Sequence, residues 1–147
     1  MTTLYLDTSS LLKLYVYEDG SDEVRQDLSD CAAAATSAVA YAEARAAFAR
    51  RRRDGTLSAA VFRAAKRDLD ADWPQYLVVE PSVTLCRSAG ELAERHALRG
   101  FDSLHLATFL QVVQDSRSSE VRFSSFDRAL NRAATAALRR QRRSRLS

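Results

Sequence analysis

The sequence predicts an α/β fold of three layers, with a mostly parallel sheet of four or five strands flanked by helices. The first observation is an alternation, along all 147 residues, of short apolar runs with longer segments of helical periodicity. The second is the absence of internal repeats and low-complexity linkers, which together with 46% hydrophobic residues indicates one core. Strands separated by helices are joined by right-handed crossovers, so we expect neighbouring strands to run parallel.

In the first third of the chain, two apolar runs enclose two helical segments. Residues 3–7 (TLYLD) predict a strand that ends in an acid, and leucines at helical spacing follow it. Residues 18–21 (EDGS) are typical of a turn. Ser21 and the two acids after it predict the start of a second helix, because such groups bind free backbone amides. A weaker strand is predicted over residues 32–37.

Two long helical segments follow. Residues 38–53 are rich in alanine, contain neither Gly nor Pro, and precede Gly55, which is typical of a helix C-terminus. Residues 58–73 repeat this pattern, with Ser58 as the expected N-cap and Pro74 closing the segment. Both segments are therefore predicted to be helices.

The second half of the chain continues the alternation. Residues 76–81 (YLVVEP) predict a tightly packed strand, and helices are predicted over residues 83–98 and 101–113, on either side of a glycine. Residues 120–125 (EVRFSS) predict the last strand, and residues 126–139 predict the closing helix. We expect all of these elements to belong to one domain.

The arginines fall into two blocks. We expect one domain over residues 1–138 and a detachable basic tail over residues 139–147, without which the chain is slightly acidic. This tail is either a frayed, solvated end or a binding arm. The other block is a candidate for binding a polyanionic substrate, although cations are also favoured at a helix C-terminus. It consists of Arg50, Arg51, Arg52 and Arg53.

The sequence shows no sign of membrane insertion or structural zinc. It has no run of about 18 apolar residues and no basic leader before a cleavable segment, so we expect a cytoplasmic protein without membrane contact. Cys31 and Cys86 have no Cys or His partner at zinc-ligand spacing. We therefore expect two reduced, packed thiols.

Four acids stand where chemistry is expected. Ligands of open parallel sheets collect beyond the carboxyl ends of the strands. Asp7 closes the first predicted strand and Asp127 follows the last, so these side chains converge if the two strands are neighbours. Glu43 and Asp102 each share a helix face with apolar residues, where a charge needs a partner. These faces are Val39, Ala42, Ala46 and Ala49 for the first, and Leu106, Phe109 and Val113 for the second.

Each acid also has a purely structural interpretation. The three aspartates could cap or begin helices, and Glu43 could be solvated at the edge of its stripe. If the fold gathers all four, however, two carboxylates about 4 Å apart repel by roughly 4 kcal/mol at an effective dielectric near 20. Shared protons could relieve this repulsion. Hard cations such as Mg²⁺ or Mn²⁺ also prefer oxygen ligands, and they would activate water and orient a phosphodiester.

Four motifs carry a family resemblance: LDTSSLLKLY, SAVAYAEARAAF, GFDSLHLATFL and RFSSFDRAL. In this order they resemble the PIN-domain ribonucleases, especially the VapC-type toxins of prokaryotic toxin–antitoxin pairs, over roughly residues 1–138. The resemblance implies a PIN-like nuclease domain and an endoribonuclease that cleaves RNA phosphodiester bonds with Mg²⁺ or Mn²⁺. It also implies a small antitoxin protein as partner, and the family often forms homodimers.

The resemblance assigns roles to individual residues. Asp7 and Asp102 correspond to the principal metal ligands, and Ser125 matches a hydroxyl position of the family. His105 belongs to the family signature, and we interpret it as a packed, hydrogen-bonded residue rather than a ligand. The implied catalytic set is Asp7, Glu43, Asp102 and Asp127.

Two other functional classes compete with a ribonuclease. A catalytically silent module of the same fold would bind nucleic acid or protein through its arginines, without dependence on metal. A phosphotransferase of the haloacid-dehalogenase kind needs a second Asp two residues after Asp7, where Ser9 stands. That residue disfavours the phosphotransferase.

Overall fold

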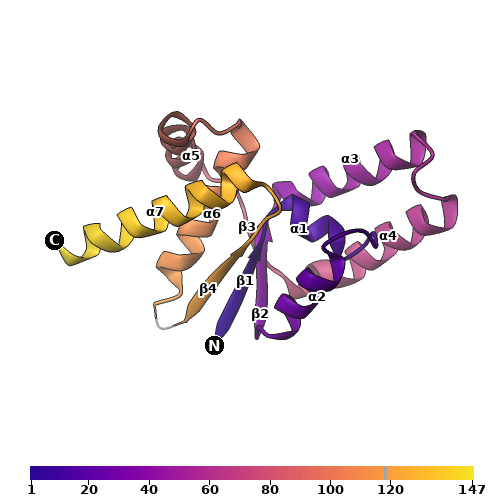
Figure 1. The fold of residues 1–147 in the computed structure, drawn as a ribbon, viewed down its shortest axis with the longest axis horizontal. Coiled ribbons are helices and arrows are strands. Elements are labelled where there is room, and N and C mark those ends of the chain that lie inside the picture. Colours follow the sequence, from indigo (N-terminus) through magenta and orange to yellow (C-terminus); the bar gives the residue numbers. More distant parts are fainter. Residues whose placement is uncertain (118) are drawn as a thin grey trace.

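A computed structural model describes residues 1–117 and 119–147. Within them, four strands form one all-parallel sheet of order β3-β2-β1-β4, which confirms the predicted α/β class (Figure 1). All four strands lie within or directly beside the predicted apolar runs, and β3 is shorter than expected. The strands are β1 (Thr2–Leu6), β2 (Ala33–Ser37), β3 (Leu77–Val79) and β4 (Glu120–Ser124).

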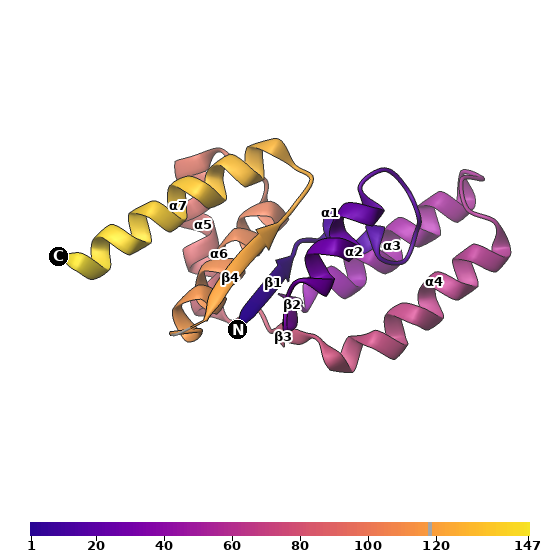
Figure 2. The ribbon, with the colours of Figure 1, turned by 60° about the horizontal axis from the view of Figure 1, so that its bottom comes forward.

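Helices cover both faces of the sheet. One apolar cluster joins the sheet to α5, α6 and α7, and the other joins it to α1 through α4. Figures 1 and 2 show these two groups on opposite sides of the strands. The helices are α1 (Thr8–Lys13), α2 (Ser21–Ser29), α3 (Val39–Arg53), α4 (Ala59–Asp72), α5 (Val83–His96), α6 (Gly100–Asp115) and α7 (Arg128–Leu146), with a short 3₁₀ turn, η1 (Trp73–Gln75). None of the helices in the described residues is long and apolar enough to cross a membrane.

The central strand β1 supplies both halves of the core. Successive side chains of a strand point to opposite faces of the sheet. Tyr5 accordingly packs in the cluster with α5, α6 and α7, whereas Leu4 and Leu6 pack in the cluster with α1 through α4. All three are essentially inaccessible to solvent.

The carboxyl ends of β1 and β4 lie side by side. The two strands pair in register from Thr2 with Glu120 to Leu6 with Ser124. The Asp7 amide donates to the Ser124 carbonyl at 3.1 Å, which continues this pairing one residue past β1. The adjacency that the sequence left as a condition is therefore met, and the segment after β4 lies beside Asp7.

The C-terminal boundary of the last helix was predicted incorrectly. We expected a helix over residues 126–139, whereas α7 continues to Leu146. Residues 139–146 contain no Gly or Pro and consist largely of Arg and Gln, which are good helix formers. The basic segment is a helical extension, and its assignment as a separate tail remains a prediction.

Position 20 requires glycine, because of its backbone conformation and because a neighbouring side chain lies close to it. It is the N-cap of α2 with a φ of 92°, in the left-handed region that disfavours other residues. A Cβ atom built at this position would lie 2.6 Å from Cε1 and 2.8 Å from Cζ of Phe126. The Lys13 ammonium covers the same ring at 4.6 Å from its centroid. The turn between α1 and α2 thus packs directly on the residue before Asp127.

We predict that Gly20→Ala lowers the free energy of unfolding by about 1 to 3 kcal/mol, because the φ is strained and the ring must move. Gly90→Ala is the matched control, since Gly90 lies inside α5 with nothing within 4 Å of its added Cβ. This control should raise the free energy by about 0.5 to 1 kcal/mol. Urea denaturation of both variants provides the measurement, and equal effects would contradict the assignment.

Candidate active site

Asp7 is held in a fixed position at the end of β1. Its side chain is only 4% exposed and caps α1, since Oδ1 accepts from the Ser10 amide at 2.9 Å. Oδ1 also accepts from the Ser9 hydroxyl at 2.7 Å, and Oδ2 accepts from the Ser125 hydroxyl at 2.5 Å. The helix-cap interpretation is therefore correct. Asp7 can still bind a further group, because Oδ2 accepts one hydrogen bond and retains a lone pair.

Asp127 joins the site through Ser125. It is the N-cap of α7, with Oδ1 accepting from the Leu130 amide at 3.0 Å. Its own amide donates at 3.0 Å to the Ser125 hydroxyl, which in turn donates to Asp7. The hydroxyl position singled out in the sequence thus links the acids that follow β1 and β4.

Asp102 is not a cap. It lies in the first turn of α6, whose N-cap is Arg99, and its Oδ2 lies 3.5 Å from Nε of that largely exposed arginine. Burial raises the pKa of Asp102 above its ordinary value, and the nearby charges of Asp127 and Asp7 raise it further, whereas Arg99 acts in the opposite direction. Two of the other predicted carboxylates, Asp7 and Asp127, therefore lie close enough to Asp102 for their charges to act on it.

Glu43 reaches the site from α3, through contacts that the sequence did not predict. Its Oε1 accepts from the Thr8 hydroxyl at 2.7 Å and lies 3.0 Å from Nε2 of His105. Burial acts to raise the pKa of Glu43, but the hydrogen bonds from His105 and Thr8 outweigh it and lower the pKa below its ordinary value. Glu43 is therefore a carboxylate at neutral pH.

The predicted apolar stripe around Glu43 was wrong. Ala42 and Ala46 are exposed, and Val39 and Ala49 are only half-buried. Because alanine occurs on every face of α3, the alanine spacing did not identify its buried side. The residues that α3 buries are Ala40, Ala44, Ala47 and Phe48. On α6 the predicted apolar face is correct, with Leu106 and Phe109 fully buried beyond Asp102.

His105 connects the core to Glu43. The sequence predicted a packed, hydrogen-bonded residue here, and the structure confirms it. The ring is buried, with Nδ1 2.9 Å from the Tyr5 hydroxyl and Nε2 3.0 Å from the Thr8 hydroxyl. Tyr5 and Thr8 were missed by sequence reasoning. Both are separated from His105 by about a hundred residues, so local sequence patterns carry no signal of these contacts.

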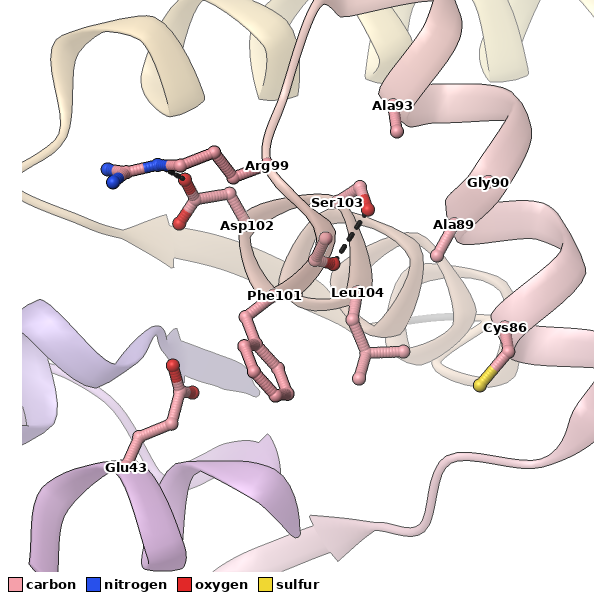
Figure 3. A pocket seen from close by; sticks show the side chains of 11 residues that line it. Glu43, Cys86, Ala89, Gly90, Ala93, Arg99, Phe101, Asp102, Ser103 and Leu104 are labelled. Carbon is pink, nitrogen blue, oxygen red and sulfur yellow. Dashed lines mark hydrogen bonds and ion pairs between the residues drawn. The ribbon is translucent and has the colours of Figure 1, made fainter. Parts of the chain in front are cut away.

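An open hollow of about 770 Å³ lies between α5 and the start of α6, with Glu43 and Asp102 on its wall (Figure 3). In Figure 3 the two carboxylates come from different helices and both lie to the left of the exposed Phe101. Cys86 is exposed on the same wall, so it is not a packed thiol, whereas Cys31 is half-buried. Acidic oxygens thus border a space open to substrate.

The arginines of α3 lie away from this hollow. Residues 50–53 form the last turn of α3, roughly 10 to 15 Å along the helix from Glu43. Arg51 forms a salt bridge with Glu18, with 2.9 Å between Nη1 and Oε2, and the other three arginines are exposed. None of the four lines the hollow, and their assignment to substrate binding stays a prediction.

The donor set fits a hard divalent cation. Within residues 1–117 and 119–147, no three His, Cys, Asp or Glu side chains stand close enough together to bind one ion by themselves. Mg²⁺ needs fewer protein ligands, because it keeps several waters and binds through one or two carboxylates together with substrate phosphate. Asp7 and Asp102 supply two carboxylates. Burial and the charges of Asp127 and Asp7 raise the pKa of Asp102, and a bound cation would act against both effects.

Two comparisons show the family. The PIN domain family model matches residues 4–136. Ribonuclease VapC45 and Ribonuclease VapC49, each from a strain of Mycobacterium tuberculosis, are 39% identical over 112 residues, which cover 76% of this chain and 78% of each relative.

A solved structure shows the same fold. It is a crystal structure of VapBC2 from Rickettsia felis bound to a DNA fragment from their promoter, and the matching chain superposes with a TM-score of 0.53 at 13% identity. The match covers 84% of this chain and 99% of the other. By family model and sequence identity, this chain belongs to the PIN-domain family and, within it, to the VapC ribonucleases.

Proposed function

We propose that the chain is a divalent-metal-dependent endoribonuclease that hydrolyses RNA phosphodiester bonds. The observation that carries this proposal is that the aspartates after β1 and β4 lie near the one that begins α6. The pKa of Asp102 is raised first by burial and then by the charges of Asp127 and Asp7. Asp102 also lines the open hollow together with Glu43, and carboxylates beside an open space are suited to a cation and to a phosphodiester. The kinship with proteins named ribonucleases selects RNA as the substrate.

Asp7 and Asp102 would hold Mg²⁺ or Mn²⁺, and the bound ion would supply Lewis-acid stabilisation of the charge on the phosphodiester. Ser9, Ser10 and Ser125 fix the Asp7 carboxylate by donating three hydrogen bonds to it. Glu43 is ionised, and no hydrogen bond occupies its Oε2 within the described residues, so that atom can accept a proton from attacking water. Asp127 completes the acidic centre.

We further propose that the chain is the toxin of a toxin–antitoxin pair, restrained by a small antitoxin protein. The kinship with VapC45 and VapC49 supports this role, and a VapBC2 structure shares the fold. The apolar helices are compatible with a homodimer as a further level of assembly.

We expect Asp102→Asn to reduce RNA cleavage in Mg²⁺ by roughly 100-fold or more while making the protein more stable at neutral pH. The pKa of Asp102 is higher in the folded state than its ordinary value of 3.8. The carboxyl therefore stabilises the folded state at pH values below 3.8, and this contribution is lost as the pH rises through the raised pKa. The Asn side chain of the variant does not ionise, so the variant does not lose this stability at neutral pH. Thermal unfolding from pH 3 to 8 should show the variant's advantage disappear at the acidic end.

The matched control is Asp68→Asn, which changes the charge equally at an exposed position of α4. Its cleavage rate and melting temperature should stay near those of the unmodified chain. Asp7→Asn should lose cleavage like Asp102→Asn, and chelation of the metal should do the same to the unmodified protein. Undiminished cleavage by both aspartate variants would reject the assignment.

Two substitutions at Asp127 separate its structural and chemical roles. Asp127→Ala removes the cap of α7 and should lower the free energy of unfolding by about 1 kcal/mol. Asp127→Asn keeps a capping oxygen and should unfold like the unmodified chain. Both variants should cleave RNA more slowly. Full activity of the Asn variant would show that Asp127 serves only as a cap.

Removing the His105 imidazole should impair folding and activity together. His105→Ala leaves the buried Tyr5 hydroxyl without its ring partner and should lower the free energy of unfolding by about 2 to 3 kcal/mol. The pKa of Glu43 should rise as its hydrogen bond is lost. His105→Gln offers an amide donor toward Glu43 and should recover part of the cleavage rate. Full activity of the Ala variant at a temperature where it is folded would contradict this role.

A further inference from the structure

Four arginines form a stripe along the exposed face of α7. At 3.6 residues per turn they fall within about 60° of one another around the helix axis. The opposite face is buried in the core through Leu130, Ala133, Ala134 and Ala137. The stripe begins one residue after Asp127 and extends about 22 Å along the helix. It consists of Arg128, Arg132, Arg139 and Arg143, all exposed.

These charges have no acidic partner in the part of the chain that the structure describes. Helix α7 carries seven arginines and no acid within its bounds, and none of the seven pairs with an acid anywhere in the described parts of the chain. Like charges three or four residues apart oppose helix formation by about 0.2 to 0.5 kcal/mol per pair. The helix dipole favours Arg143 in the last turn but disfavours Arg128 in the first. Helix stability alone therefore does not account for the stripe.

A basic hollow borders the stripe where α5 ends against α7. It has a volume of about 350 Å³ and is lined by Arg95, His96, Ala136, Arg140, Arg143 and Ser144, without any acid. The Nε2 atom of His96 is buried and has no hydrogen-bond partner among residues 1–117 and 119–147. Burial lowers the pKa of His96, and the charges of Arg95 and Arg140 lower it further. Cationic groups thus lie close together in a concave site, where a bound anion would reduce the repulsion between them.

We infer that the arginine stripe and the basic hollow of α7 bind the phosphate backbone of RNA and lead the strand away from the catalytic centre. The inference rests on the proposed function for the identity of the polyanion. The Asn131 amide donates to the Ser125 carbonyl at 2.8 Å, which fixes the start of α7 to the loop that carries Asp127. The stripe therefore keeps a fixed position relative to the loop that carries Asp127.

The composition of the surface favours a nucleic acid over a lipid bilayer. A helix that lies on a membrane inserts an apolar face, whereas the apolar face of α7 is packed against the core. The distal half of α7 extends past the rest of the molecule in Figures 1 and 2, so its arginines are accessible over a long path. Guanidinium groups bind phosphate oxygens in bidentate geometry.

The test compares the affinity of two double variants for a fluorescein-labelled, 20-nucleotide single-stranded RNA, measured by anisotropy in EDTA so that no cleavage occurs. In Arg139→Gln/Arg143→Gln, we expect binding to weaken about 10-fold at roughly 100 mM salt. The slope of log affinity against log salt should become shallower by about 1.4, since each lost phosphate contact removes about 0.7. The Gln side chains preserve helix propensity.

The matched control is Arg63→Gln/Arg87→Gln, with the same charge change at exposed helical positions of α4 and α5. It should change neither the affinity nor the slope. Equal losses in the two double variants, or a loss confined to Arg50→Gln/Arg53→Gln, would overturn the inference. So would unchanged RNA affinity of the α7 variant combined with loss of its binding to anionic phosphatidylserine vesicles.

Cleavage in Mg²⁺ separates this inference from the proposed function. If the unmodified chain cuts RNA and the α7 variant binds and cuts equally well, the stripe inference fails while the nuclease assignment stands. If the unmodified chain binds RNA through α7 but never cuts it, the nuclease assignment fails and the stripe stands as a binding surface. The α7 variant of an active nuclease should show a raised KM at nearly constant kcat.

Discussion

The pairing of β1 with β4 is the contact on which the rest of the site depends. These strands are more than a hundred residues apart in the sequence, yet their hydrogen bonds continue from Asp7 to the Ser124 carbonyl. The pairing places Ser125 where it can donate to one acid and accept from the amide of another. Without it, Asp7 and Asp127 would be helix caps at unrelated positions. With the pairing, the charges of both acids act on Asp102 and add to the effect of its burial on its pKa.

The structural and chemical interpretations of the acids are not alternatives. Asp7 and Asp127 cap helices with one oxygen, and the same bonds fix the carboxylates in place. Holding the acids close together has an energetic cost, which is visible at Asp102. Burial and the charges of Asp127 and Asp7 raise its pKa, so its ionised form is disfavoured. The fold thus retains an unfavourable charge distribution, of the kind expected where a site is built to receive a cation.

The sequence predicted the strands, the helix order and the two caps, because these depend on local patterns. It failed where several residues look alike or where partners are remote. Alanine on every face of α3 concealed its buried side, which Phe48 alone marks strongly. The contacts of His105 with Tyr5 and Thr8 join segments about a hundred residues apart. The end of α7 was misplaced because a run of charge was interpreted as solvation, although arginine also favours the helix.

The turn that holds Gly20 has a consequence for the chemistry as well as for the fold. Its backbone lies against Phe126, and this ring immediately precedes Asp127 and follows Ser125. Any larger side chain at position 20 must displace the ring and, with it, the loop that sets the spacing of two acids. Natural variation at this turn would therefore adjust the turnover of the enzyme while leaving every acidic residue intact, a route to attenuation that inspection of the carboxylates alone would overlook.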